Sequence, residues 1–322
     1  MTAPRPPVLR VLITGVSGFV GRHLAAALAA RGDEIHGFGL GARPAEPPLA
    51  GWQPGDTLDP DAVSAAVAAS RPDAVIHLAG QSSAAVSFEH PVETYRTNAL
   101  GTWTLLDAVR KHAPRARVLI VGSGEVYGPQ PEGSRVAEDA PFRPVSPYAL
   151  SKAAADALSD AFARRHGLAV IRTRSFGHTG PGQSPTFAIP SFARQVVAIE
   201  AGRAEPVLRV GNLDVTRDLT DVREVVEAYL ALLARGRAGA AYNVCRGEGV
   251  KLRDAVGRMV ARARVPVRIE VDPARVRPAD LGYLVGDPEA MARDTGWRAT
   301  MPLDRTLEDV LEDWRRRPAV AD

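Results

Sequence analysis

The sequence predicts an α/β protein, a doubly wound parallel sheet with a smaller C-terminal α/β domain. Three observations lead to this prediction. Short apolar runs typical of buried strands alternate with segments of helical spacing as far as about residue 172. A turn with three glycines joins the first apolar run to the first helical segment. Past residue 172 the alternation gives way to segments rich in proline and glycine, which indicate the loops of a second region.

The expected elements follow one another as strand and helix from the N-terminus. Apolar runs predict a strand just before Gly55 and further strands at 8–15, 34–40, 73–80, 116–123 and 168–176. Helical spacing predicts helices at 19–32, 61–72, 95–113 and 146–167. Because strands and helices alternate, we expect parallel pairing through right-handed crossovers.

One helix and one strand of the second half are expected to return to the main sheet. The helix runs from Asp221 to about Arg235, where Asp221 can cap the first turn and Glu224 can complete a capping box. The strand covers residues 240–247. The two domains are therefore interleaved. The first comprises residues 1–172 and roughly 212–245, and the second comprises roughly 173–211 and 246–322.

Composition argues against several classes of protein. The 322 residues carry a net charge of +3, and the arginines are spread without the block typical of a nucleic-acid-binding arm. We expect an anionic small substrate and no nucleic-acid partner. With Cys245 as the only cysteine and no Cys/His cluster at metal-ligand spacing, neither a disulfide nor a metal site is expected. The N-terminus lacks the apolar core of a signal peptide, and no apolar run approaches the ~18 residues of a membrane span. These features favour a cytoplasmic protein without membrane contact.

The turn "TGVSGFVG" has the spacing of a phosphate-binding turn. Gly15, Gly18 and Gly21 allow a tight turn, close approach of the backbone to a pyrophosphate, and close packing of helix on strand. The free N–H groups at the helix N-terminus would bind the phosphates. The alternative is a glycine-rich turn without a ligand. We expect a dinucleotide cofactor that is held at this turn by Gly15, Ser17, Gly18, Phe19, Val20 and Gly21.

The end of the second predicted strand favours NADP(H) over NAD(H). A carboxylate that binds the adenosine ribose of NAD is expected about 20 residues past the glycines. The sequence there reads "FGLGAR" and contains no carboxylate. A 2′-phosphate would meet no repulsion, and Arg43 can pair with it through two hydrogen bonds. NAD(H) remains the alternative, with Arg43 as a solvated loop residue.

Further residues are expected to border the cofactor at the carboxyl ends of the strands. Asp56 lies where a carboxylate can accept a hydrogen bond from the adenine amino group, and a surface aspartate is the alternative. The stretch "HLAG" brings the backbone close to a dinucleotide, and Asn98 begins a long helix that faces the same crevice. The residues assigned to this border are Asp56, Thr57, Leu78, Ala79, Gly80 and Asn98.

Tyr148 and Lys152 lie one helical turn apart in the stretch "SPYALSK". Ser146 suits the N-cap and Pro147 the first helical position, so Tyr148 falls in the first turn and shares a helix face with Lys152. Tyrosine has an ordinary pKa of about 10, so proton transfer near neutrality needs a stabilised phenolate. We expect the Lys152 ammonium and an oxidised nicotinamide to lower the pKa of Tyr148. The Y-x-x-x-K pattern alone is common by chance and fits a helix surface equally well.

The preceding predicted strand strengthens the catalytic interpretation. Ser123 ends this strand beside the expected nicotinamide, where its hydroxyl can hydrogen-bond a carbonyl or carbinol oxygen while Tyr148 transfers the proton. Glu125 lies two residues further on. It is either a general base for an acidic C–H group or a carboxylate that positions the substrate.

Four motifs in this order and spacing, "TGVSGFVG", "HLAG", "VGSGEVYG" and "SPYALSK", resemble those of the extended short-chain dehydrogenase/reductases that act on nucleotide sugars. The resemblance runs almost from end to end. It implies a Rossmann-type domain, a smaller C-terminal substrate domain, and a catalytic set of Ser123, Tyr148 and Lys152. It also implies that Phe176 and His178 border the cofactor.

The C-terminal half resembles the branch of this family that acts on GDP-mannose derivatives, and within it the 4-ketone reductases. The segments that carry this resemblance are "TGPGQSPTFAIPSFARQ", "VGNLDVTRDLTDVREVVEAY", "YNVCRGEGV" and "DPARVRPADLGYLVGD". The resemblance implies a GDP-linked 6-deoxy-4-keto sugar as substrate. Arg217 and Arg277 would bind its diphosphate and Asp280 its ribose, unless these are solvated loop charges. The other substrate-binding residues would be Ser82, Ser123, Gly177 and Arg194.

Gly177 departs from the family pattern, because relatives usually carry Asn there, and this bears on sugar selectivity. A sister dehydratase, which oxidises C4 and eliminates water across C5–C6, is the nearest rival function, and Glu125 is consistent with it. The stretch "TRDLTDV" favours the reductase, since the dehydratases typically have a Trp-Gly-His type sequence there. A nucleotide-sugar 4-epimerase and a catalytically inactive nucleotide sensor are further alternatives.

A homodimer is expected from the same resemblance. Relatives commonly pack the helix at about 98–112 and the helix that opens at Ser146 into a four-helix bundle with a second copy. The Ala-rich stretch "SKAAADALSDAFA" permits such close approach.

Overall fold

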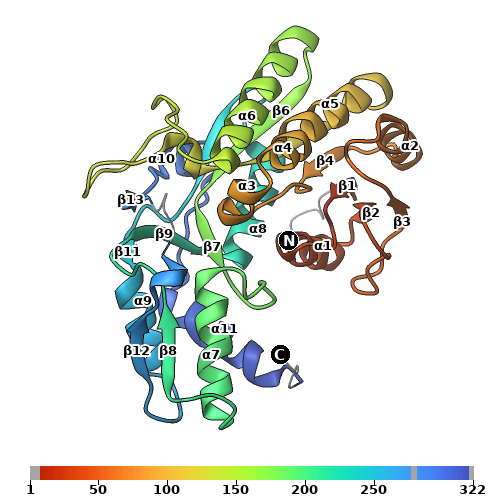
Figure 1. The fold of residues 1–322 in the computed structure, drawn as a ribbon. Coiled ribbons are helices and arrows are strands. Elements are labelled where there is room, and N and C mark those ends of the chain that lie inside the picture. Colours follow the sequence, from red (N-terminus) through yellow and green to blue (C-terminus); the bar gives the residue numbers. More distant parts are fainter. Residues whose placement is uncertain (1–7, 277–280, 319–322) are drawn as a thin grey trace, which may run out of the picture.

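The fold is built around a parallel sheet in the computed structural model, which describes residues 8–276 and 281–318 (Figure 1). Within these residues seven strands pair in the order β10-β6-β5-β4-β1-β2-β3, all parallel. The strand order changes direction beside β1, so the carboxyl ends of β1 and β4 form the crevice where dinucleotides bind in such sheets. The strands are β1 (Arg10–Thr14), β2 (Glu34–Gly39), β3 (Gly51–Pro54), β4 (Ala74–His77), β5 (Arg117–Ser123), β6 (Ala169–Ser175) and β10 (Ala241–Val244).

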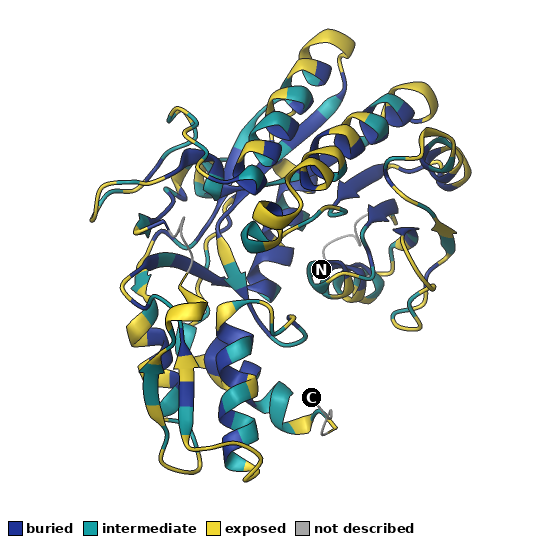
Figure 2. Cartoon of the chain, in the orientation of Figure 1, coloured by how far each residue is buried: buried dark blue, intermediate teal, exposed yellow. Residues whose placement is uncertain are grey.

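Helices cover both faces of this sheet and bury its side chains in two apolar clusters. The exposed residues lie along the outer faces of the helices (Figure 2). One face is covered by α1 (Phe19–Arg31), α8 (Val222–Arg235) and α10 (Glu289–Thr295). The other is covered by α2 (Pro60–Ser70), α5 (Gly101–His112) and α6 (Pro147–His166). Shorter helices on the second side are α3 (Ala84–Glu89), α4 (Pro91–Tyr95) and the π-helical turn η1 (Arg96–Leu100).

A second region carries its own apolar cluster. Its sheet has the order β11-β9-β13, and β7 also pairs with β9, while β8 and β12 form a separate parallel pair. Its strands are β7 (Gly177–Thr179), β8 (Val207–Val210), β9 (Thr216–Asp221), β11 (Gly249–Lys251), β12 (Arg268–Val271) and β13 (Tyr283–Leu284). Its helices are α7 (Ala188–Glu200), α9 (Leu252–Val260), α11 (Leu303–Arg316) and the 3-10 turn η3 (Pro273–Arg275).

The predicted fold class is confirmed, and the predicted return of the chain to the main sheet is seen in α8 and β10. β10 pairs with β6 in parallel, and α8 packs against α1. One part of the segment 212–245 differs from the expectation, because β9 belongs to the smaller sheet. The chain therefore returns to the main sheet later than the sequence indicates, and α10 brings it back to that sheet once more.

The start of α8 is only partly as predicted. The Asp221 carboxylate accepts a hydrogen bond from the backbone N–H of Arg223, which confirms it as the N-cap. The capping box was a wrong prediction. The buried Glu224 carboxylate instead accepts hydrogen bonds from the N–H groups of Thr300 and Met301. Glu224 thus attaches α8 to the segment before α11.

The long helix predicted at 95–113 is interrupted near its start. Residues 96–100 form the π-helical turn η1 and α5 follows it, so Asn98 lies in a π turn rather than at a helix start. Such turns are frequent at functional sites. Across residues 8–276 and 281–318, no helix is long and apolar enough to cross a membrane.

Candidate active site

The glycine turn is shaped by contacts that no other residue type would allow. Gly15 has φ +73°, and a Cβ there would lie 2.7 Å from the backbone nitrogen of Ala79. A Cβ at Gly21 would lie 2.4 Å from the carbonyl oxygen of Gly15. Gly18 is exposed and forms the N-cap of α1. The turn therefore lies directly against the end of β4, with the N-terminus of α1 open toward the carboxyl edge of the sheet.

A buried hydroxyl–imidazole pair fixes the end of β4 against this turn. The Thr14 hydroxyl lies 2.7 Å from Nδ1 of His77, and it accepts a hydrogen bond from the N–H of Ala79 at 3.2 Å. Burial, with a smaller effect of the Lys152 charge, lowers the pKa of His77 to about 3, so the imidazole is neutral. This pair was missed from the sequence, although a hydroxyl at the last position of the apolar strand β1 was a usable signal.

Gly80, Asn98 and Lys152 come together beside the turn. A Cβ at Gly80 would lie 2.7 Å from Asn98 Oδ1 and 3.5 Å from Lys152 Nζ. The Asn98 amide accepts a hydrogen bond from the N–H of Gln81 and donates to the Gln81 carbonyl and the Ser151 hydroxyl. Asn98 thus attaches the loop after β4 to α6, at the point where a cofactor would pass Lys152.

The catalytic helix begins as the sequence predicts. The Ser146 hydroxyl caps the N–H of Ala149 at 3.0 Å, and Pro147 is the first helical residue. Tyr148 is buried in this first turn. Lys152, one turn further on, donates from Nζ to the Val121 carbonyl on β5 at 3.0 Å. α6 thus carries both side chains, and Lys152 reaches β5.

Ser123, Glu125 and Tyr148 meet at the carboxyl end of β5. Ser123 caps the 3-10 turn η2 (Gly124–Tyr127) by accepting the N–H of Glu125. Burial raises the pKa of Tyr148, the nearby Glu125 charge raises it further, and a hydrogen bond with Ser123 lowers it in part. The expectation that Lys152 lowers the pKa of Tyr148 is not met in the protein alone. Burial also lowers the pKa of Lys152, to about 8.

Three predicted cofactor residues lie in the loops after β2 and β3. The Arg43 guanidinium is exposed and donates to the Leu49 carbonyl in the loop between the two strands. Asp56 is exposed, and its carboxylate accepts the N–H of Leu58 at 2.9 Å. Thr57 is buried, and its hydroxyl lies 2.7 Å from where a Cβ at Gly101 would be. Its side chain thus packs on α5, whereas Arg43 and Asp56 stay accessible.

His178 and Phe176 have different surroundings. The His178 ring stacks on Phe19, the first residue of α1, with ring centroids 6.2 Å apart. Its Nδ1 lies 3.0 Å from the Phe176 carbonyl oxygen. The Phe176 ring lies in an apolar cluster, where a Cβ at Gly124 or Gly286 would come within 3 Å of it. His178 therefore lies beside the glycine turn, whereas only the backbone of Phe176 remains for a cofactor.

The donor set fits a bound dinucleotide. The open N-terminus of α1, the glycine positions that leave no room for a Cβ, and Lys152 lie along one edge of the sheet. In the described ranges, 8–276 and 281–318, no group of three His, Cys, Asp or Glu side chains is placed to hold a metal ion.

The comparisons with known proteins agree with this geometry. A family model described as GDP-mannose 4,6 dehydratase matches residues 12–310. The chain belongs to this family. It is 38% identical to the GDP-6-deoxy-D-mannose reductase of Pseudomonas aeruginosa over 309 residues, which cover 96% of this chain and 98% of the reductase.

Solved structures of related proteins have the same fold. RMD from Pseudomonas aeruginosa, complexed with NADPH, matches with a TM-score of 0.82 at 36% identity, covering 95% of this chain and 98% of that chain. The Thermus thermophilus UDP-glucose 4-epimerase, in complex with NAD, matches with a TM-score of 0.86 at 30% identity, covering 96% and 99%. This member of the GDP-mannose 4,6 dehydratase family thus shares its fold with RMD and with a UDP-glucose 4-epimerase.

The predicted substrate residues of this family member come from several elements. A Cβ at Gly177 would come 2.7 Å from the Asp218 carbonyl oxygen, so no side chain fits there unless β9 moves. The Arg217 guanidinium on β9 donates to the carbonyls of Thr216 and Leu281. Arg194 is exposed on α7, and Ser82 is exposed after β4. Arg277 and Asp280 lie outside the described residues.

A second buried tyrosine near Tyr148 was also missed from the sequence. The hydroxyl of Tyr229 on α8 lies 2.8 Å from the Ser175 hydroxyl on β6, and Ser175 pairs with Ser123 in the strand register. Burial raises the pKa of Tyr229 to about 12, and Tyr229 contributes to the raised pKa of Tyr148. The contact joins a helix to a strand end 54 residues away. No local pattern could have revealed it.

Proposed function

We propose that the protein reduces the C4 ketone of GDP-4-dehydro-6-deoxy-D-mannose to GDP-D-rhamnose, with NADPH as the reductant. The observation that carries this proposal is the buried Tyr148 in the first turn of α6, which burial keeps protonated at the sheet edge beside the glycine turn. A protonated phenol is the form that donates a proton to a carbonyl oxygen. The 38% identity to the Pseudomonas reductase supports the choice of substrate.

The three catalytic side chains have different roles in this proposal. Bound NADPH supplies the hydride for C4. Tyr148 donates its proton to the ketone oxygen, and Ser123 donates a hydrogen bond to the same oxygen, which stabilises the charge that develops there. Lys152 binds the nicotinamide ribose and stabilises the phenolate that Tyr148 leaves behind. We therefore expect the pKa of Tyr148 to be lowered in the complex with the cofactor and not in the protein alone.

NADP(H) is the proposed cofactor, and Arg43 its specificity residue. Residues 40–43, directly after β2, contain no carboxylate, and the guanidinium of Arg43 is exposed with a carbonyl as its partner, so it can turn to a 2′-phosphate. The NADPH in the RMD structure supports this choice.

Replacing Arg43 by Ala should weaken NADPH binding by about 10-fold or more, because a charge-assisted contact is worth about 1.5–3 kcal/mol. NADH binding should stay unchanged, since it lacks the 2′-phosphate. Fluorescence titration of both cofactors measures the effect, and an unchanged ratio of the two dissociation constants would exclude Arg43 from this role.

The GDP end of the substrate is assigned to the second region. We propose that Arg217 and Arg277 bind the diphosphate and Asp280 the guanosine ribose, with Arg194, Ser82 and the backbone at Gly177 around the sugar. A guanidinium can exchange carbonyl partners, such as those that Arg217 has here, for phosphate oxygens.

An NADPH-oxidation assay tests the proposed function. The protein should consume NADPH with GDP-4-dehydro-6-deoxy-D-mannose and should leave NADPH unchanged with GDP-mannose alone. NMR of the product should show the C4 configuration of GDP-D-rhamnose. No NADPH consumption with the keto sugar would refute the reductase assignment.

Dehydration of GDP-mannose is the second candidate function. Glu125 lies in η2, two residues after Ser123, and its charge raises the pKa of Tyr148, which supports a role as the base for an acidic C–H. In that case GDP-mannose alone would give a 4-keto product without net consumption of cofactor.

A homodimer through the α5 and α6 side is also proposed. Apolar side chains lie exposed there, and a groove of about 560 Å³ lies between α4 and the start of α6. The exposed residues are Val92, Tyr95, Leu100, Trp103, Val145 and Leu150. We also propose a cytoplasmic location, which agrees with the single, free and buried Cys245.

Leu150→Arg should convert the dimer to monomers, because it places a charge in this groove, where Leu150 is 53% exposed. Val271→Arg is the matched control, because Val271 is 55% exposed on β12 in the second region. Sedimentation velocity measures the result. A dimer that survives Leu150→Arg would place the interface elsewhere.

A further inference from the structure

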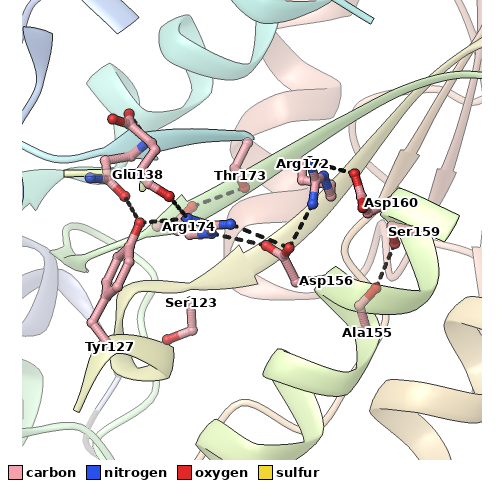
Figure 3. A network of polar contacts seen from close by, with 12 residues as sticks. Ser123, Tyr127, Glu138, Ala155, Asp156, Ser159, Asp160, Arg172, Thr173 and Arg174 are labelled. Carbon is pink, nitrogen blue, oxygen red and sulfur yellow. Dashed lines mark hydrogen bonds and ion pairs between the residues drawn. The ribbon is translucent and has the colours of Figure 1, made fainter. Parts of the chain in front are cut away.

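Arg174 on β6 is a buried cation, and its guanidinium forms hydrogen bonds with several neighbouring residues (Figure 3). Its Nε donates to Oδ2 of Asp156 at 3.0 Å, and its Nη2 lies 3.4 Å from Oδ1 of the same carboxylate. Its Nη1 donates to the Tyr127 hydroxyl at 2.8 Å and to the Glu138 carbonyl at 2.6 Å. We call Tyr127, Glu138, Asp156 and Arg174 the Arg174 cluster.

The two side chains bound by Arg174 belong to the two segments that carry the catalytic residues. Asp156 follows Lys152 by one turn and Tyr148 by two turns on α6, so all three lie near one helix face. Tyr127 ends the 3-10 turn η2, whose N-cap is Ser123. Arg174 thus contacts the proton-donor helix and the Ser123 turn at the same time.

The chemistry of the Arg174 cluster favours fixed geometry over net stability. A guanidinium presents its donors in a rigid planar fork, so a carboxylate on one side and a hydroxyl on another are held at a set separation. Buried ion pairs often add little net stability, because desolvation offsets the attraction. The rings of Tyr127 and Phe142 further confine the guanidinium, whose central carbon lies 5.4 and 4.6 Å from their centroids.

We propose that Arg174 is a positioning residue for catalysis, which holds η2 and α6 at the separation that lets Ser123 and Tyr148 reach the same ketone oxygen. Arg174 has no contact with either catalytic side chain among the described residues. It acts through Tyr127 on one side and Asp156 on the other. The kinetic test of this proposal rests on the proposed function, whereas the test by crystal structures of the variants does not.

Arg172, two residues earlier on β6, provides a matched control. It donates to Asp156 at 2.9 Å, forms an ion pair with Asp160 at 3.0 Å, and donates to the Gly239 carbonyl. Its contacts thus include α6 but not η2. If Arg174 only anchored α6 or stabilised the fold, replacing Arg172 or Arg174 should have the same effect. The proposal instead predicts different effects of the two replacements.

The kinetic test compares Arg174→Lys with Arg172→Lys. Lysine keeps the charge but lacks the fork, so in Arg174→Lys kcat should fall by about 10²-fold, as expected when reacting groups shift by about 1 Å. KM for both substrates should stay within about threefold, because binding groups are untouched. Arg172→Lys should keep kcat within about threefold of wild type. Equal losses in the two variants, or a kcat near wild type in Arg174→Lys, would overturn the proposal.

Tyr127→Phe covers the case in which Arg174→Lys fails to fold. It removes one hydroxyl and leaves the Arg174–Asp156 pair intact, and kcat should again fall while NADPH binding is retained. Unchanged kcat in folded Tyr127→Phe would contradict the proposal.

Crystal structures of the Arg174 and Arg172 variants provide the readout that is independent of the proposed function. The separation of the Ser123 and Tyr148 hydroxyls should change in Arg174→Lys and stay as in the wild type in Arg172→Lys. If the wild type does not reduce the keto sugar, the proposed function fails while this comparison still decides the role of Arg174. An unchanged separation of these two hydroxyls in Arg174→Lys would refute it.

Discussion

Tyr148→Phe should lower kcat by about 10²–10⁴-fold, the range that a positioned general acid contributes. The phenyl ring keeps the buried packing of the tyrosine and loses only the hydroxyl. NADPH binding should therefore change little. Single-turnover measurements with the keto sugar, together with a fluorescence titration of NADPH, separate the two effects.

The control for Tyr148→Phe is Tyr95→Phe, which removes the hydroxyl of a tyrosine that is 42% exposed on α4. Its turnover should equal that of the wild type. Near-normal turnover of Tyr148→Phe would assign the proton transfer to another group and so contradict the mechanism.

Lys152→Met should abolish most activity and yet stabilise the cofactor-free protein at pH 7. Burial lowers the pKa of Lys152 from 10.5 to about 8, so the folded protein holds this proton less tightly than the unfolded chain. At about 1.4 kcal/mol per pKa unit, the buried ammonium costs about 3 kcal/mol below pH 8. Loss of the hydrogen bond to the Val121 carbonyl lowers the free energy of unfolding by about 1 kcal/mol. The net gain in the free energy of unfolding is therefore about 2 kcal/mol.

The gain in the free energy of unfolding of Lys152→Met should shrink as the pH rises. Between pH 8 and 10.5 the unfolded chain binds more protons than the folded protein, so wild-type stability rises through this window relative to the variant. Urea unfolding of both proteins at pH 7 and pH 9.5 measures the difference. Lys251→Met, at an exposed lysine, should show no such pH dependence. A gain in Lys152→Met that is equal at both pH values would show that the ammonium is not the cause.

The parts of the site that the sequence predicts well are those set by short-range sterics. Gly15 and Gly21 are required by contacts within the turn and with the neighbouring strand, and the start of α6 follows from Ser146 and Pro147. The strand and helix pattern places Ser123 at a strand end for the same reason. Local chemistry therefore determines where these residues lie.

The parts that the sequence does not predict depend on partners far apart in the chain or on depth of burial. Thr14 and His77 are 63 residues apart, and Arg174 and Tyr127 are 47 apart. The pKa of Tyr148 is raised rather than lowered because burial outweighs its neighbours, and burial is a property of the finished fold. Glu224 forms no capping box because the segment at 300–301 offers its carboxylate closer donors.

The repeated crossing of the chain between its two regions has a consequence for dissection of the protein. α8 and β10 follow three strands of the second region in sequence, yet they complete the main sheet, and α11 returns to the second region after α10. A fragment that ends at residue 172 would lack β10 at the edge of β6 and would expose the apolar face that α8 covers. No single cut in the chain yields two complete halves, so the two regions form one inseparable folding unit.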